Sequence, residues 1–222
     1  MNKEKLYPKL LGFVFLIVIA FSLFGGLMSD GAIGKGNIDD MMVNGATNSN
    51  ILFFGILGNL FTSILIVLLA TLLYITLRDQ NKVVATWAFG LWIIEALFIA
   101  ITTLFTFSFL NLSKEFVNSN LSNLSYLTSI GSLLHNLMQY SYYLHMVFYC
   151  IGGLLFYYLL FKSKYIPRAI PLFGIIAVFV GLIGELFSLS GHIVPIYVFI
   201  PILPFELLIG VWLIINGFNC RK

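Results

Sequence analysis

Residues 51–110 read ILFFGILGNLFTSILIVLLATLLYITLRDQNKVVATWAFGLWIIEALFIAITTLFTFSFL, and this stretch decides the fold. Two apolar runs, 51–77 and 84–110, flank one short polar turn that contains Arg78 and Lys82. Each run exceeds the ~20 apolar residues that a helix needs to cross a bilayer, and both are too long for ordinary strands. Because backbone groups in lipid must satisfy their own hydrogen bonds, the stretch predicts two membrane-spanning helices joined by a tight turn.

Further apolar runs lie on both sides of this pair. They cover about residues 10–28, 132–161, 169–190 and 194–217. Longer polar connections are expected at 29–50 and 111–126, and short ones at 162–168 and 191–193. The sequence therefore predicts an all-α fold, a polytopic integral membrane bundle of six transmembrane helices that forms one domain over residues 1–222.

The composition agrees with a membrane environment. Of the 222 residues 60% are hydrophobic and 9% are charged, whereas a soluble domain carries about 25% charged residues. So few charges would leave the surface of a soluble globule apolar and prone to aggregation. This excludes an ordinary soluble domain, a disordered chain and a nucleic-acid-binding protein.

The distribution of basic residues predicts the orientation. With six spans, all the lysines and arginines fall on one side of the membrane except Lys35 and Lys114. Basic residues concentrate on the cytoplasmic side of membrane proteins, so both termini are expected to be cytoplasmic and the chain to lie in the cell (inner or plasma) membrane. The run 10–28 is followed by no clear A-x-A cleavage site, and we expect it to be a retained span rather than a signal peptide.

Three stretches carry a resemblance to a known family. They are Phe156–Arg168 with the apolar span that follows, Pro204–Phe218, and, more weakly, Leu72–Lys82. Together they resemble the domain-of-unknown-function family 4386 (DUF4386), over roughly residues 10–218. The resemblance implies a six-helix integral membrane protein of the bacterial inner membrane. It implies no activity, cofactor or catalytic residue set.

Three glutamates, Glu95, Glu185 and Glu206, lie inside apolar runs. An acidic side chain at the centre of a bilayer costs about 2.5–3.5 kcal/mol on insertion scales, so such residues usually face the interior of a helix bundle and mark functional sites. Glu95 and Glu206 fall near the middle of their runs, and Glu185 falls in the outer half of its run. Two carboxyls at the midplane would be able to share a proton or hold a cation if their helices touch.

Glu206 also has a structural explanation. Pro201 and Pro204 interrupt the last apolar run and free backbone groups that must find partners. A carboxylate two residues after Pro204 would be placed to accept hydrogen bonds from a new helix N-terminus. Discontinuous helices of this kind also mark binding sites in transporters. The structural and the functional interpretations are compatible, and both stay open.

The span 169–190 carries a row of polar residues near its outer end. Glu185, Ser188 and His192 have the spacing i, i+3 and i+7, which places residues of a helix on one face. Gly181 and Gly184 lie close to this row, and small residues of this kind allow another helix to approach. We expect the row to face the interior of the bundle.

The span 132–161 carries a second polar row. His135, Gln139 and Tyr142 share one helical face, and the row continues towards His145. His135 is expected at the outer interface and His145 deeper, as a core histidine or as a functional group. Several tyrosines of this span, Tyr149 among them, are candidates for the aromatic belt at the membrane interface.

The histidines do not form a known metal motif. Zinc takes imidazole and carboxylate ligands, so the candidate ligand set consists of His135, His145, His192 and Glu185. His135 and His145 are about three turns apart on a straight helix, too far for one ion, and the chain has no H-E-x-x-H motif and no cysteine cluster. His145 has no histidine at matching depth on another span to complete a haem site. We therefore predict no metal and no cofactor.

Three functions remain open at this level. The first is a small binding or transport bundle with protonatable intramembrane acids and a small-molecule or cation ligand. The second is a membrane-embedded enzyme, metal-dependent in one version, that acts on a lipid or another hydrophobic substrate. The third is a non-catalytic partner or protective subunit of another membrane protein. The expected surroundings are the lipid bilayer, and a membrane-protein partner or a second copy of the chain is compatible with all three. Acids on several helices and the interrupted last span favour the first.

Overall fold

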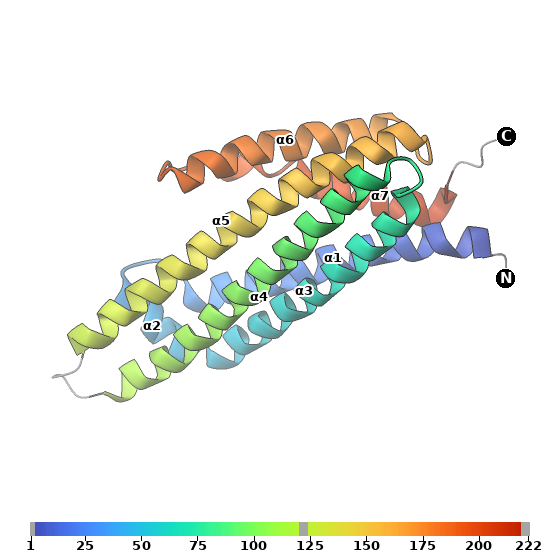
Figure 1. Ribbon diagram of the computed structural model, residues 1–222. Coiled ribbons are helices and arrows are strands. Elements are labelled where there is room, and N and C mark those ends of the chain that lie inside the picture. Colours follow the sequence, from blue (N-terminus) through green and yellow to red (C-terminus); the bar gives the residue numbers. More distant parts are fainter. Residues whose placement is uncertain (1–2, 120–123, 219–222) are drawn as a thin grey trace. The chain divides into compact units, whose positions relative to one another are not determined.

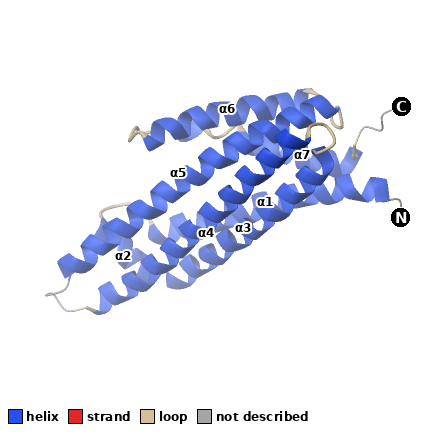
Figure 2. Cartoon of the chain, in the orientation of Figure 1, coloured by secondary structure: helices blue, strands red, loops and turns tan. Residues whose placement is uncertain are grey.

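The computed structural model describes residues 3–119 and 124–218 (Figure 1). Every regular element within these ranges is helical (Figure 2). Arg221 and Lys222, which contributed to the predicted charge asymmetry, lie outside the described residues. The elements in chain order are α1 (Lys3–Ile33), α2 (Ile38–Thr47), α3 (Ser49–Leu77), α4 (Lys82–Asn118), α5 (Leu124–Ser163), α6 (Ala169–Leu189), the short 3₁₀ helix η2 (Ile196–Val198) and α7 (Ile202–Asn216).

Six helical segments of the described chain are long and apolar enough to cross a membrane. Five of them come from α1, α3, α4, α5 and α6, and the sixth runs from Ile196 to Asn216 through η2 and α7. The predicted all-α class and the six predicted spans are therefore confirmed.

Helices α4 and α5, like α1, are much longer than their apolar runs. Helix α4 has 37 residues and α5 has 40. At a rise of about 1.5 Å per residue they are roughly 55 and 60 Å long, whereas the hydrocarbon core of a bilayer is about 30 Å thick. Most of the predicted connection 111–126 is therefore helical. The physical reason is that Phe116 and Leu127, at the extended ends, are buried in a hydrophobic cluster.

Contacts between the helices divide the chain into two compact units. Unit 1 consists of Met1–Ala20, Ile64–Ala96 and Tyr143–Lys222, and unit 2 consists of Phe21–Ser63 and Leu97–Tyr142. Both units are described here separately. The prediction of a single domain over residues 1–222 stays a prediction.

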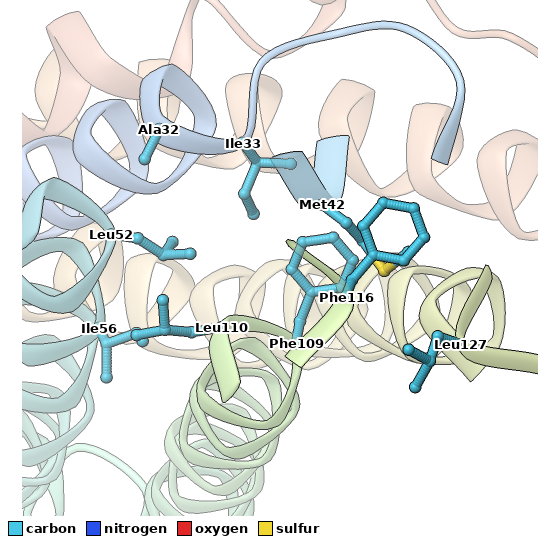
Figure 3. Close-up of a cluster of buried hydrophobic side chains, with 9 residues drawn as sticks. All are labelled: Ala32, Ile33, Met42, Leu52, Ile56, Phe109, Leu110, Phe116 and Leu127. Atoms are coloured by element: carbon cyan, nitrogen blue, oxygen red, sulfur yellow. The ribbon is translucent and has the colours of Figure 1, made fainter. Parts of the chain in front are cut away.

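The core of unit 2 is a cluster of buried hydrophobic side chains from α1, α2, α3, α4 and α5 (Figure 3). Figure 3 shows Met42 of α2 beside the rings of Phe109 and Phe116. The full cluster comprises Ala32, Ile33, Met42, Leu52, Ile56, Phe109, Leu110, Phe116 and Leu127. Helix α2 thus contributes a side chain to this core.

Helix α2 lies in the region 29–50, whose composition predicted only a polar connection. The side chain of Asn37 caps its first turn by accepting a hydrogen bond from the Asp40 backbone N–H at 2.8 Å. Near its other end, the amides of Asn44 and Asn48 donate to the backbone carbonyls of Ile33 and Ala32, both at 3.3 Å. These carbonyls belong to the last turn of α1, where the helix offers them no partner. The asparagine side chains of this region therefore stabilise a helix rather than a loop.

Several helix ends lie close together in unit 1. The Tyr7 hydroxyl near the start of α1 donates to the Leu72 carbonyl of α3 at 3.5 Å. A methyl group on Gly217, directly after α7, would lie 3.7 Å from Pro8. The ring of Phe218 stacks on Tyr165 in the turn between α5 and α6, with centroids 5.0 Å apart. The beginning of α1, the ends of α3 and α7 and the α5–α6 turn therefore lie at one end of this unit.

The predicted interruption of the last span lies near its beginning. The 3₁₀ helix η2 ends at Val198, Pro201 stands at the N-cap position of α7, and Pro204 is the third residue of that helix. Proline is tolerated in the first turn because the N–H groups there have no intrahelical acceptor. Helix α7 is therefore continuous from Ile202 to Asn216.

Candidate functional site

All three predicted acids belong to unit 1, and two of them, Glu95 and Glu206, lie within electrostatic range of each other. Glu95 of α4 is 4% exposed, and its Oε2 atom is buried without a hydrogen-bond partner. Glu206 of α7 is partly buried and lies within electrostatic range of Glu95. The sequence left open whether the helices that carry these two carboxyls touch, and the electrostatic interaction between Glu95 and Glu206 places the two groups near each other. Both carboxyls lie in membrane-spanning segments, where charge is costly.

Tyr149 of α5 binds one of these acids directly. Its hydroxyl donates a hydrogen bond to Oε1 of Glu206 at 2.7 Å. The hydroxyl of Tyr157, two helical turns further along α5, lies 3.5 Å from the Tyr149 hydroxyl. Tyr149 is buried, so the prediction that it belongs to an interfacial aromatic belt is wrong. Its hydroxyl instead satisfies a carboxyl from another helix.

Trp92 fixes the position of Tyr149. Its indole N–H donates to the Tyr149 backbone carbonyl at 3.1 Å, and the two rings stack with centroids 6.0 Å apart and planes 10° from parallel. The residue opposite is Gly152, where a methyl group would collide with the Trp92 ring. Because Trp92 and Glu95 are three residues apart on α4, they share one helical face. One face of α4 thus carries both Glu95 and the Trp92 ring that positions Tyr149 of α5.

Aromatic rings surround this hydrogen-bonded group. Phe156 packs edge-on against Trp92 with centroids 4.9 Å apart, and Tyr157 packs edge-on against Phe205 with centroids 4.6 Å apart. Phe156, Tyr157 and Phe205 are fully buried. Edge-to-face pairs of this kind are worth about 0.5–1.5 kcal/mol beyond the burial of their area. The rings hold Glu95, Tyr149 and Glu206 in an environment of low polarity; we call these three residues the acid–tyrosine cluster.

The structural explanation for Glu206 does not match α7. Glu206 is the fifth residue of this helix, beyond the first turn, and α7 has no side-chain hydrogen bond at its N-cap. The carboxylate accepts from Tyr149 on α5 instead. The expectation that Glu206 would satisfy the start of a new helix is therefore wrong, because the helix begins before Pro204 rather than after it.

The third acid, Glu185 of α6, is 2% exposed, and its Oε2 atom has no hydrogen-bond partner. The predicted row that begins with Glu185 is only partly formed. Ser188 is partly buried and donates to the Gly184 carbonyl at 3.2 Å. His192 lies beyond the end of α6 at Leu189, where its exposed ring contacts Phe187. His192 therefore does not continue the helical face.

The polar row of α5 is divided between the two units. His135, Gln139 and Tyr142 belong to unit 2 and His145 belongs to unit 1. Gln139 and Tyr142 are exposed, while His135 is partly buried with Nδ1 lacking a hydrogen-bond partner. Within the ranges 3–119 and 124–218, no three His, Cys, Asp or Glu side chains are arranged to hold a metal ion.

Trp92 and Tyr157 were not among the predicted site residues, and Tyr149 was predicted to lie at the membrane interface. Two residue spacings in the sequence indicate this arrangement. Trp92 precedes Glu95 by three residues, and Tyr149 and Tyr157 are eight apart, which places each pair on one helical face. Gly152 between the tyrosines marks the close approach of a ring from another helix.

The six membrane-length helices and the buried acids between them define a multi-pass integral membrane protein in a lipid bilayer. The family model described as Domain of unknown function (DUF4386) matches residues 10–217, and the chain belongs to this family. Neither the curated proteins nor the solved structures that were compared gave a match.

Proposed function

We propose that this protein is a small binding or transport bundle in which Glu95 and Glu206 bind a proton or a small cation. The observation that supports the proposal is the hydrogen bond from Tyr149 to Glu206, with Glu95 in electrostatic range and its Oε2 unpartnered. Three helices, α4, α5 and α7, contribute one group each. Such an arrangement is costly within a membrane unless the charges are neutralised.

Charge repulsion is the physical basis of the proposal. Two carboxylates close together in an interior of low polarity repel each other, so a proton or a cation between them lowers the energy. The Tyr149 hydroxyl is already committed to Glu206. The unpartnered Oε2 of Glu95 is the oxygen that has capacity for a further ligand. A group that gains and loses a cation in this way is suited to coupled transport.

The orientation is part of the proposal. The basic residues Arg78, Lys82, Lys164 and Arg168 flank the α3–α4 and α5–α6 turns. The second turn lies at the end of unit 1 where α1 begins and α7 ends. By the positive-inside rule this end is cytoplasmic, with both termini on the same side. The membrane is the bacterial inner membrane, as the family resemblance implies.

The two alternative functions have less support among the described residues. A metal-dependent enzyme would need at least two histidines and an acid around one point, and residues 3–119 and 124–218 contain no such group. A partner or protective role would need an exposed polar or small-residue face that another protein covers. Glu95 and Tyr149 of the acid–tyrosine cluster are buried and do not provide such a face.

The proposal can be tested by infrared titration of the purified protein in lipid nanodiscs. The carbonyl stretch of protonated carboxylic acids reports proton binding at buried glutamates. We expect Glu95→Gln and Glu206→Gln each to remove part of a pH-dependent band that the wild type shows. Glu115→Gln, which replaces an exposed glutamate of α4, is the matched control and should leave that band unchanged.

Transport is tested with the same variants in proteoliposomes. A pH-sensitive dye inside the vesicles follows proton movement after an external pH change. We expect the wild type to acidify the interior faster than protein-free vesicles and faster than either glutamine variant. A wild-type band that neither variant alters, together with a proton flux equal to that of protein-free vesicles, would contradict the proposed function.

A further inference from the structure

We infer that Glu185 is the acid through which protons reach the acid–tyrosine cluster from the side of the membrane where α6 ends. This inference rests on the proposed function and adds the route by which the cluster is loaded. Glu185 is buried and its Oε2 has no hydrogen-bond partner. This oxygen therefore has capacity to bind a proton.

Helix packing places Glu185 on the correct face of α6. Gly181 and Glu185 are four residues apart and therefore lie on the same side of the helix. A methyl group on Gly181 would lie 3.5 Å from the Cys150 sulfur of α5 and 3.0 Å from Ile202 of α7. The side of α6 that carries Glu185 is thus the side that meets the two helices bearing Tyr149 and Glu206.

Cys150 connects the two parts of the route. Its thiol lies within electrostatic range of Glu185, Glu95 and Glu206 together. The thiol itself is fully buried. Because Cys150 directly follows Tyr149 in α5, the three acids from α4, α6 and α7 are grouped around one short segment of that helix. The hydroxyls of Tyr149 and Tyr157 on the same helix also lie within electrostatic range of Glu206.

The position of Glu185 along α6 gives its carboxyl access to water in the proposed route. Glu185 is four residues before the end of the helix at Leu189, a distance of about 6 Å along the axis. The residues that follow, Gly191 and His192, are exposed. A proton from water at this end binds Oε2 of Glu185 and then passes to a carboxylate of the acid–tyrosine cluster. Glu185 is left as a carboxylate that accepts the next proton from the same side.

The experiment is a rapid pH jump followed by time-resolved infrared spectroscopy of the protein in nanodiscs. Glu185→Gln is expected to leave the pH-dependent band of Glu95 and Glu206 in place and to slow its response about tenfold or more, as for the loss of a proton-transfer group. Glu115→Gln should respond as fast as the wild type. A Glu185→Gln response at the wild-type rate overturns the inference while the proposed function stands.

A second measurement uses the unaltered protein and therefore does not depend on the folding of a variant. The protein is reconstituted into proteoliposomes in one orientation, and the pH is changed on one side at a time. The acid–tyrosine cluster should respond faster when the pH changes on the side of the α6–α7 connection. Faster arrival from the opposite side overturns the inference. A band that neither Glu95→Gln nor Glu206→Gln alters, together with a proton flux equal to that of protein-free vesicles, overturns the proposed function itself, and the inference with it.

Discussion

Gly12 of α1 and Gly210 of α7 meet backbone to backbone: a methyl group on Gly12 would lie 2.5 Å from the Gly210 carbonyl oxygen. The same methyl group would lie 3.0 Å from the Ile214 backbone nitrogen. In lipid, helices associate through close packing at small residues, since burial from water contributes little there. The contact therefore fixes the first and last spans against each other within unit 1.

The two glycines should differ in their tolerance of a methyl group. Gly12→Ala places it against backbone atoms that cannot move aside, whereas Gly210→Ala first meets the end of the Leu16 side chain, at 2.7 Å. We expect Gly12→Ala to lower the free energy of unfolding by about 1–3 kcal/mol, as overpacking does, and Gly210→Ala by less. Denaturant titration in mixed micelles provides the measurement. Gly26→Ala, which meets no atom within 4 Å, is the control, and equal losses for all three would contradict the prediction.

Tyr149→Phe removes only the hydroxyl and keeps the ring that stacks on Trp92. A hydrogen bond to a charged group contributes about 1.5–3 kcal/mol, so we expect a loss of this order in the free energy of unfolding and a changed infrared band for Glu206. Tyr158→Phe, at an exposed tyrosine of α5, should change neither quantity. If the two variants behave alike, the Tyr149 hydroxyl does not support Glu206.

Gly152→Ala tests the seat of Trp92. The added methyl group would collide with the indole ring, and the ring must move away from the Tyr149 carbonyl. We expect a loss of stability of about 1–3 kcal/mol and a red shift of tryptophan fluorescence. Gly90→Ala, in α4 two residues before Trp92 and with no atom within 4 Å of the added group, should be neutral or slightly stabilising because alanine favours helices. A neutral Gly152→Ala would show that the ring has room to move.

Asn48→Leu tests the contact between α2 and α1. It removes the amide that donates to the Ala32 carbonyl, so a partly buried carbonyl loses its partner at a cost of about 1–3 kcal/mol. Hydrogen exchange should increase in α2 and at the end of α1. Asn50→Leu, at an exposed position of α3, should leave the exchange of both segments unchanged. Unchanged exchange in Asn48→Leu would show that α2 is held by its apolar side chains alone.

The proposed orientation is tested with single cysteines in a Cys220→Ser background, where Cys150 is buried. Asp79→Cys lies in the α3–α4 turn and His192→Cys follows α6, and both positions are exposed. A membrane-impermeant maleimide added to intact cells, with the outer membrane permeabilised, should label His192→Cys and leave Asp79→Cys unlabelled until the inner membrane is opened. The reverse pattern would invert the proposed topology.

The membrane-spanning helices were predictable from the sequence because each must be apolar along its whole length. Their true ends were not, since Phe116 and Leu127 extend α4 and α5 through packing that involves residues distant in the chain. Helix α2 left a readable signal in Asn37 followed by Asp39 and Asp40, which is typical of a helix start. That signal was outweighed by the polar composition of the region.

The candidate site was predictable in part. Glu95 and Glu206 stood out because charge is rare in apolar runs. Tyr149 and Trp92 did not, because tyrosine and tryptophan are common in membrane helices and only the fold distinguishes an interfacial ring from a buried one. The role of Glu206 depends on the residue at which α7 begins. Because Pro201 and Pro204 are three residues apart, the sequence alone was compatible with more than one helix start.

The stacking of Trp92 on Tyr149 gives the protein an internal optical probe. The chain has three tryptophans, and Trp87 is largely exposed whereas Trp92 is buried three residues from Glu95. Replacing Trp87 and Trp212 by phenylalanine would leave one fluorophore at the buried acids. Its emission would then follow their charge state in real time, without any added label and before a ligand is identified.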